Sequence, residues 1–149
     1  MEKWKPMRNP LPTVDIILRN SEGQIVLIQR RNPPHGWALP GGFVDAGESC
    51  ETAARREARE ELSVSVKLIH QLGTYSDPER DPRIHTISVV FVAEQDSSDT
   101  IRGADDALEA KWFLPDELPW DELCFDHDKI ILDYLEWNKT CPAFGEEQS

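Results

Sequence analysis

Apolar runs and polar breaks divide the first part of the chain into two strands and a loop. Residues 13–19 (TVDIILR) and 24–30 (QIVLIQR) are rich in Val and Ile, which favour strands. Because the turn-forming stretch NSEG separates them, we predict a strand pair joined by a short turn. Residues 32–42 (NPPHGWALPGG) contain three prolines and three glycines, and this composition predicts a loop.

The rest of the chain continues to alternate helices and strands. Residues 48–62 are dominated by Ala, Glu and Arg, which are good helix formers, so this segment predicts a helix. No internal repeat or linker interrupts the pattern, and we expect residues 1–149 to form one mixed α/β (α+β) domain with its core at about residues 12–137. Further strands are predicted at residues 64–69, 86–94 and 109–114, loops at 75–85 and 95–106, a second helix at 126–137 behind the candidate N-cap Asp126, and a loose tail from about 139.

Charge and composition limit the classes of partner. The formal net charge is -12, which disfavours nucleic acid as a partner because phosphate contacts need a basic surface. No run approaches the ~20 apolar residues of a membrane span, and the first ten residues lack the apolar core of a signal peptide. The three cysteines are widely spaced and form no CxxC pair. We therefore expect a cytoplasmic protein that needs cations to handle phosphates.

A helix over residues 48–62 would bring three carboxylates together. Glu57, Glu60 and Glu61 fall at i, i+3 and i+4, so they share one face and repel one another. A solvated acidic surface is one reading of such a face. A second reading is that the helix lies close to a sheet and that the acidic edge is partly buried. It is favoured by the small residues beside the carboxylates, which include Ala53, Ala54 and Ala58. Buried carboxylates need a counter-charge, and Mg²⁺ supplies one because it prefers oxygen ligands.

The segment from Gly42 to Val64 reads GFVDAGESCETAARREAREELSV. Its fixed positions resemble the Nudix box of hydrolases that cleave nucleoside diphosphates linked to another moiety. They are Gly42, Glu48, Arg56, Glu57, Glu60 and Glu61. The resemblance implies a Nudix fold, a mixed sheet sandwiched between helices, in which the box forms a loop, a helix and a loop.

The same resemblance implies roles for individual residues. Glu57, Glu60 and Glu61, with the backbone carbonyl of Gly41, would bind Mg²⁺, with Mn²⁺ as a second option. Arg56 and Glu48 would brace the box through a charge-assisted bond. One position departs from the family pattern, because Ser63 stands where Gly usually ends the helix with a positive φ. No ligand is lost by this change, so we expect it to affect the local loop and not the activity.

Candidates for the catalytic base lie in the acidic segment GADDALEAKWF. Asp105 or Asp106 could take a proton from the attacking water or bind another metal, and the alternative is that both only form a turn. Glu109 is a weaker candidate. The base is thus left open between these carboxylates.

Flanking phrases resemble one subgroup, the bacterial and archaeal ADP-ribose pyrophosphatases. They are NPLPTVDIIL, NPPHGWALPGGFVDAGES and YSDPERDPRIHTISVVF. This resemblance implies ADP-ribose as a small-molecule substrate and AMP and ribose 5-phosphate as products. Trp37 could stack on the adenine or simply pack. Arg83 could hold a phosphate and His85 a ribose hydroxyl, or both could lie in a solvated loop. Side-chain alternation lets one of Arg30 and Arg31 face the site, and Arg31 is our candidate.

Three alternatives remain at this point. A house-cleaning nucleoside triphosphate pyrophosphatase of the 8-oxo-dGTP type would use the same metal site. A non-catalytic module that binds ADP-ribose usually carries an output domain, for which we expect no room in 149 residues. An acidic scaffold that binds nothing would show no saturable Mg²⁺ binding. A homodimer is compatible with the sequence, which does not determine the oligomeric state.

Overall fold

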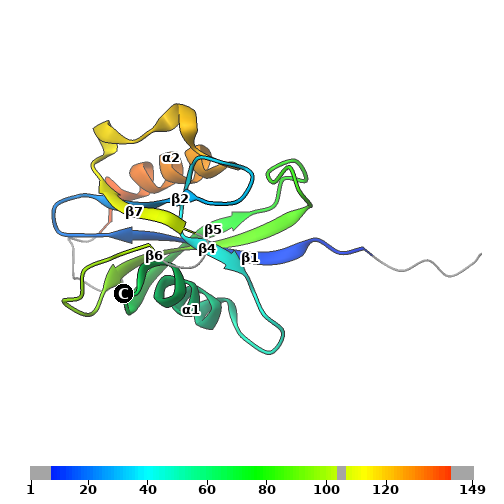
Figure 1. Ribbon diagram of the computed structural model, residues 1–149, viewed down its shortest axis with the longest axis horizontal. Coiled ribbons are helices and arrows are strands. Elements are labelled where there is room, and N and C mark those ends of the chain that lie inside the picture. The colour runs from blue at the N-terminus through cyan, green and yellow to red at the C-terminus, as the bar shows by residue number, and fades with distance from the viewer. Residues whose placement is uncertain (1–7, 104–106, 142–149) are drawn as a thin grey trace, which may run out of the picture.

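A mixed β-sheet between two helices forms the body of the molecule. The computed structural model describes residues 8–103 and 107–141. Helix α1 (Cys50–Leu62) covers one face of the sheet and helix α2 (His127–Asn138) covers the other (Figure 1). This arrangement is the mixed sheet sandwiched between helices that the resemblance of the box implies.

The central strands of the sheet run in parallel, and the flanking pairs are antiparallel. The strand order is β3-β2-β1-β6-β5, while β4 pairs with β1 and β7 pairs with β2. Only the β1–β6 pair is parallel among these described pairings. The strands are β1 (Leu11–Arg19), β2 (Ile25–Arg30), β3 (Trp37–Ala38), β4 (Gly41–Phe43), β5 (Val66–Tyr75), β6 (Thr86–Gln95) and β7 (Ala107–Phe113), and two short 3-10 helices span Pro115–Glu117 and Trp120–Glu122.

Side-chain alternation along β1 divides the core into two layers. Val14 and Ile16 belong to the cluster that α1 covers, whereas Ile17 belongs to the cluster that α2 covers. All three are fully buried. Because alternate residues point to opposite faces, Asp15 shares the α2 face with Ile17. A buried carboxylate therefore lies under the N-terminus of α2.

The predicted strand pair and the buried strand at 86–94 are confirmed. β1 and β2 are antiparallel and joined by a turn at Asn20, whose side chain accepts from the backbone N–H of Glu22 and Gln24. β6 lies between β1 and β5. The strand predicted at 64–69 is longer than expected and reaches Tyr75, because the polar residues of its second half pair with β6.

The prediction that residues 32–42 form only a loop is wrong, because β3 and β4 lie in this segment. β4 pairs with β1 at Asp15, Val14 and Thr13. Glycine makes that approach feasible, since a Cβ on Gly41 would lie 2.1 Å from the carbonyl oxygen of Val14. Composition identified the turn-formers but not this long-range pairing.

Helix α1 begins two residues later than predicted, at Cys50, and packs as its sequence predicts. Ser49 is the N-cap, and its side chain accepts from the N–H of Thr52 at 3.1 Å. The alanines at positions 53, 54 and 58 are fully buried against the sheet. Glu57 and Glu61 of the acidic edge are buried beside them. The opposite side of the helix is exposed, as the positions of Arg55 and Arg59 show.

Helix α2 forms close to its predicted bounds, but its predicted N-cap has a different role. Asp126 stands at the N-cap position without a side-chain cap hydrogen bond. Its carboxylate instead accepts two hydrogen bonds from Arg80, at 3.0 and 2.7 Å. No helix in the described part of the chain is long and apolar enough to cross a membrane.

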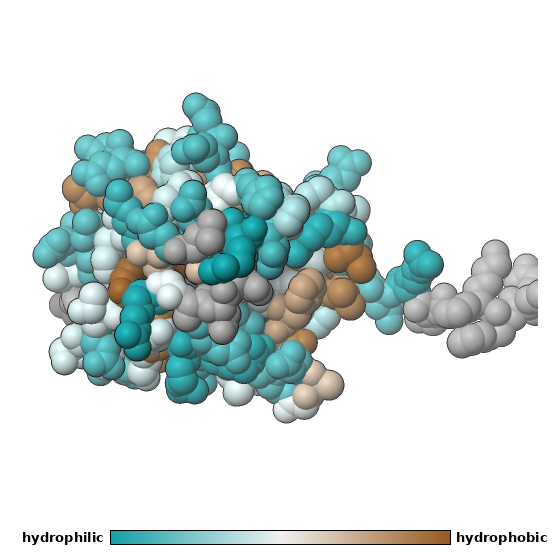
Figure 2. All heavy atoms as spheres, in the orientation of Figure 1, coloured by the Kyte–Doolittle hydropathy of each residue, from teal (hydrophilic) through white to brown (hydrophobic). Residues whose placement is uncertain are grey.

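The viewed surface is mostly hydrophilic, in keeping with the acidic composition. Apolar side chains gather at the end where β1 begins (Figure 2). The exposed large apolar side chains include Leu11, Phe43 and Ile84. Phe43 of this group also lines the cavities described below.

We expect Ser63→Gly to stabilise the protein by about 0.5–1 kcal/mol. Ser63 has φ 60 and ψ 31, and its N–H donates to the carbonyl of Arg59 at 3.1 Å. An L-residue in this left-handed conformation costs about 1–2 kcal/mol, and the extra freedom of glycine in the unfolded chain offsets part of the gain. Urea denaturation measures the difference. Ser65→Gly is the matched control, because φ of Ser65 is not positive, and it should destabilise. A loss of stability in Ser63→Gly would contradict the expectation.

Candidate active site

The carboxylates of α1 lie against β4. Glu57 and Glu61 are each 8% exposed, whereas the side chain of Glu60 is 48% exposed. The backbone N–H of Gly41 donates to Glu61 Oε2 at 3.2 Å. A Cβ on Gly42 would lie 2.5 Å from Glu57 Oε1, so these two glycines permit the close contact. The predicted acidic edge is therefore partly buried between helix and strand.

Arg56 connects the carboxylates of α1 to the chain that precedes the helix. It binds Glu48 through two hydrogen bonds of 2.6 and 3.1 Å, so the predicted brace is present as a contact. Its Nη1 donates to Glu57 at 2.8 Å and to Glu60 at 3.1 Å. Its Nη2 donates to the carbonyl of Phe43 at 2.9 Å. The hydrogen bond from Arg56 holds the pKa of Glu48 below its ordinary value.

The two buried glutamates have raised pKa values. Burial raises the pKa of Glu61 to about 9, and the neighbouring charge of Glu57 adds to this effect, while the hydrogen bond from Gly41 opposes it. Burial also raises the pKa of Glu57, against the lowering effect of Arg56. The positively charged groups and hydrogen-bond donors of the protein thus do not fully compensate the burial of either carboxylate.

The donor set suits a hard divalent cation, although the side chains do not surround one point. Within residues 8–103 and 107–141, no three His, Cys, Asp or Glu side chains form a group that could hold a metal ion, and Arg56 binds both Glu57 and Glu60. The available ligands are carboxylate oxygens, which Mg²⁺ and Mn²⁺ accept. A cation beside Glu61 would supply the positive charge that its raised pKa shows to be lacking.

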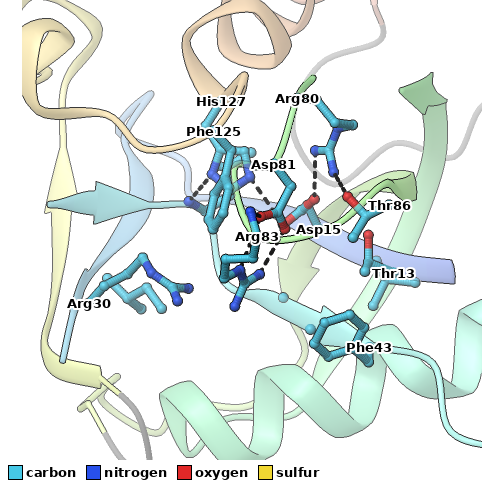
Figure 3. A pocket seen from close by; sticks show the side chains of 15 residues that line it. Thr13, Asp15, Arg30, Phe43, Arg80, Asp81, Arg83, Thr86, Phe125 and His127 are labelled. Atoms are coloured by element: carbon cyan, nitrogen blue, oxygen red, sulfur yellow. Dashed lines mark hydrogen bonds and ion pairs between the residues drawn. The ribbon is translucent and has the colours of Figure 1, made fainter. Parts of the chain in front are cut away.

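A cavity of about 310 Å³ opens over this acidic edge. Glu57 and Glu61 line it from α1, and Arg30 and Arg83 line it from β2 and from the loop before β6. The two guanidinium groups point toward the same space above α1 (Figure 3). The volume lies in the range of small-molecule sites, ~300–1,000 Å³. Opposite charges therefore meet around one cavity.

The two arginines are held in different ways. Arg30 donates to the carbonyl of Pro34 at 2.9 Å, and its guanidinium lies 5.0 Å from the ring centre of Phe125. Arg83 forms a two-bond ion pair with Asp81, at 3.0 and 2.8 Å, and lies 5.2 Å from the same ring. Despite the burial of Asp81, this pair holds the pKa of that carboxyl below its ordinary value. One aromatic ring thus supports both cations.

A smaller cavity of about 50 Å³ continues from the first. The two cavities share the lining residues Ile28, Arg30, Gly41, Gly42, Phe43 and Arg83. Its other lining residues include Asp15, Arg80, Thr86 and His127, which form a buried polar group under the N-terminus of α2 (Figure 3). Every buried side-chain nitrogen and oxygen in the described residues has a hydrogen-bond partner. The floor is therefore polar but internally satisfied.

Three predicted substrate-binding residues lie apart from both cavities. The ring of Trp37 packs edge-on against Phe113 at 5.1 Å and joins the core under α2, which is the packing alternative. His85 Nε2 lies 3.0 Å from the carbonyl oxygen of Ser76. Arg31 is exposed, and Arg30 takes the place beside the site, which corrects our choice between the two.

Two of the three candidates for a catalytic base are not placed by the structure. Asp105 and Asp106 lie outside the described residues, so their role stays a prediction. Glu109 lies in β7, is exposed and lines neither cavity.

The site also contains residues that the sequence did not indicate. Arg30 could have been found from β2, because Val26 and Ile28 belong to the layer under α1 and alternation places Arg30 with them. Phe125 and His127 gave no such signal, since they lie more than 60 residues beyond the acidic helix, near the start of α2.

Comparisons with known proteins find similarity along most of the chain. The sequence profile of the NUDIX domain matches residues 9–134. The chain is 42% identical over 139 residues to an ADP-ribose pyrophosphatase of Methanocaldococcus jannaschii, covering 92% of this chain and 80% of the relative.

Two solved structures resemble the fold closely. The NUDIX domain of Shewanella oneidensis NrtR, solved with ADP ribose, has a TM-score of 0.78 at 29% identity, with 91% of this chain and 94% of that chain covered. A bifunctional NMN adenylyltransferase/ADP ribose pyrophosphatase of Francisella tularensis, solved with AMP and a Mn ion, has a TM-score of 0.79 at 29% identity. That match covers 89% of this chain and 43% of the other.

We expect the metal-free protein to lose stability as the pH rises from about 5.5 to 9. The folded state keeps a proton on Glu61 up to a pKa of about 9, whereas the unfolded chain releases it near 4.5. The folded state then binds more protons in this window, so the free energy of unfolding falls by up to about 1.4 kcal/mol per pH unit. Urea denaturation in EDTA measures the slope.

Glu61→Gln should flatten that slope, because glutamine does not titrate. Glu51→Gln, which changes an exposed residue in the first turn of the same helix, should leave it unchanged. Equal slopes in wild type and Glu61→Gln would show that Glu61 is already ionised at neutral pH.

Proposed function

The chain belongs to the Nudix family of hydrolases, and from that premise we propose that it hydrolyses ADP-ribose to AMP and ribose 5-phosphate with Mg²⁺ as its cofactor. The observation that carries the proposal is the cavity in which the buried carboxylates of α1 face Arg30 and Arg83. The similarity to the archaeal ADP-ribose pyrophosphatase and to the ADP-ribose-bound domain supports the choice of substrate.

A diphosphate matches the charges of the cavity. Its negative oxygens would be repelled by Glu57 and Glu61 alone, so a cation between them is needed on that side. Arginine suits the other side, because its planar fork pairs with phosphate through two parallel hydrogen bonds. A sugar or nucleoside without phosphate would offer no anionic group to either arginine.

The cofactor would be held by Glu57, Glu60 and Glu61 together with the carbonyl of Gly41. When bound, Mg²⁺ neutralises the diphosphate and lowers the pKa of a water molecule. Arg56 keeps the glutamates in place through its bonds to Glu48 and the Phe43 carbonyl. Mn²⁺ can replace Mg²⁺, because both accept oxygen ligands.

The chain's own residues then hold the substrate for attack. We assign Arg30 and Arg83 to its phosphates, and Phe43 and Phe125 to the apolar wall of the cavity. Asp106 or Asp105 accepts the proton of the attacking water. Arg31, Trp37 and His85 are not included, since they lie outside both cavities.

A small molecule also suits the charge of the whole protein. At a net charge of -12, a nucleic-acid duplex would be repelled over most of the surface. A homodimer is compatible with the proposal.

We expect purified protein with Mg²⁺ to convert ADP-ribose to AMP and ribose 5-phosphate, measured by chromatography. The panel should include NADH, ADP-glucose, diadenosine polyphosphates and 8-oxo-dGTP. Glu60→Gln should abolish turnover, because it removes one charged metal ligand. Glu51→Gln removes the same charge from an exposed position of the same helix and should keep full activity.

Other outcomes of the panel have defined meanings. Faster turnover of 8-oxo-dGTP would replace the proposal with a house-cleaning triphosphatase. ADP-ribose binding without turnover of any compound would indicate a sensor. Absence of both binding and turnover, with no saturable uptake of Mg²⁺, would leave an acidic scaffold.

We expect Arg30→Gln to raise the KM for ADP-ribose at least about tenfold. A charge-assisted hydrogen bond contributes ~1.5–3 kcal/mol, which corresponds to a factor of about ten or more. Arg31→Gln is the matched control, because it removes the same charge next door without facing the cavity, and its KM should stay within about twofold. Thermal unfolding of both variants shows whether losing the hydrogen bond from Arg30 to the Pro34 carbonyl changes the stability of the protein. Equal KM values for the two variants would remove Arg30 from the substrate site.

A further inference from the structure

The imidazole of His127 links helix α2 to the strand segment beside the acidic edge. His127 is the first residue of α2 and is 2% exposed. Its Nδ1 accepts the backbone N–H of Leu39 at 3.0 Å. Because Nδ1 accepts, a neutral ring carries its proton on Nε2, and Nε2 lies 3.4 Å from Asp15 Oδ1. Contacts on both sides of the ring thus define its tautomer and orientation.

The segment that receives this bond leads directly to the proposed metal face. Leu39 is followed by Pro40, whose carbonyl accepts from the N–H of Ile16 at 2.8 Å. The next residue, Gly41, donates its N–H to Glu61 at 3.2 Å. Three hydrogen bonds at consecutive residues therefore fix the segment: one to His127, one to β1 and one to the acidic helix.

Asp15 holds the other side of the imidazole and is itself held firmly. Ser88 donates to its Oδ2, and Arg80 lies 3.8 Å from the same oxygen. Arg80 is bound in turn by Asp126, at 2.7 and 3.0 Å, and by Thr86 at 2.6 Å. The network is closed, so displacement of His127 would leave buried polar groups without partners, which is costly.

The backbone before His127 is in an uncommon conformation. Phe125 has φ 57, which is rare for a bulky residue and costs free energy unless the surroundings require it. Each residue from 125 to 127 makes a different contact at the cavities. The ring of Phe125 supports Arg30 and Arg83, the carboxylate of Asp126 binds Arg80, and the imidazole of His127 binds Leu39. These contacts together account for a strained start to the helix.

We propose that His127 is a positioning residue for the metal face: by accepting the N–H of Leu39, it fixes Leu39–Gly41 so that Gly41 stays against Glu61. This inference rests on the proposed function, because it assigns a task to the metal-binding segment. It also predicts effects that do not depend on the substrate. His127 acts on the metal face through the N–H of Leu39.

Three substitutions at position 127 test the two contacts of the imidazole separately. His127→Asn keeps an acceptor close to the position of Nδ1, and so it should rescue the bond to Leu39. His127→Gln places its amide toward Asp15 and leaves the Leu39 N–H without its acceptor. His127→Leu fills the space and removes both contacts. Mn²⁺ affinity is measured by paramagnetic resonance and calorimetry without substrate, and exchange of the Leu39 amide proton is measured by NMR in EDTA.

We expect Mn²⁺ affinity to fall about 10–100-fold in His127→Gln and His127→Leu, the usual effect of losing a residue that orients metal ligands. His127→Asn should stay within about threefold of wild type. Leu39 amide exchange should accelerate in the same two variants and stay slow in His127→Asn. If His127→Leu does not fold, the comparison of Asn with Gln decides the matter alone.

The control is Asp133→Asn, which replaces the charged acceptor of the 2.7 Å hydrogen bond from Tyr75 by a neutral one in the middle of the same helix. It should lower the melting temperature without changing Mn²⁺ affinity. Equal affinities in His127→Asn and His127→Gln, or a loss in Asp133→Asn as large as in His127→Gln, would overturn the positioning role. Wild-type protein that takes up no Mn²⁺ would overturn the proposed function, and the positioning role with it. Metal binding without ADP-ribose turnover would leave the role of His127 supported and the substrate wrong.

Discussion

The close approach of α1 to β4 is the constraint on which the rest of the site depends. Alanines on the helix and the two glycines of β4 let the elements come near enough to cover Glu57 and Glu61. Covering carboxylates costs free energy unless a cation or hydrogen-bond donors compensate. Arg56 compensates Glu57 and the Gly41 N–H compensates Glu61, yet the pKa of both carboxyls remains raised. A cation that binds this face would therefore relieve a cost that folding imposes.

Positive charge lies across the cavity from the acidic edge. In a protein with a net charge of -12, two arginines face the cavity that the acidic edge lines. Arg83 shares its charge with Asp81, whereas the hydrogen bonds of Arg30 go to the neutral carbonyls of Pro33 and Pro34. Arg30 thus presents more of its charge to an incoming anion. For the substrate that we propose, this difference favours Arg30 over Arg83 as the phosphate ligand, although the sequence pointed to Arg31.

Local patterns predicted the parts of the fold that local physics determines. Composition located α1, and apolar runs located β1, β2 and β6, because propensity and alternation act over a few residues. The carboxylate face and the Arg56–Glu48 contact followed from helical spacing and the family signature. β4 was missed because its pairing depends on the absence of side chains at Gly41 and Gly42 and not on strand propensity.

The part of the site near the start of α2 could not be predicted from the sequence for a related reason. Phe125, Asp126 and His127 acquire their roles from partners elsewhere in the chain: Arg30 and Arg83 for the ring, Arg80 for the carboxylate, Leu39 for the imidazole. No periodicity marks such a set. The positive φ at Phe125 persists because these contacts over-determine the backbone. Relieving that strain would release the ring from the arginines and the imidazole from Leu39 together. Residues 125–127 therefore contact both the arginines of the cavity and, at Leu39, the segment that leads to the acidic edge.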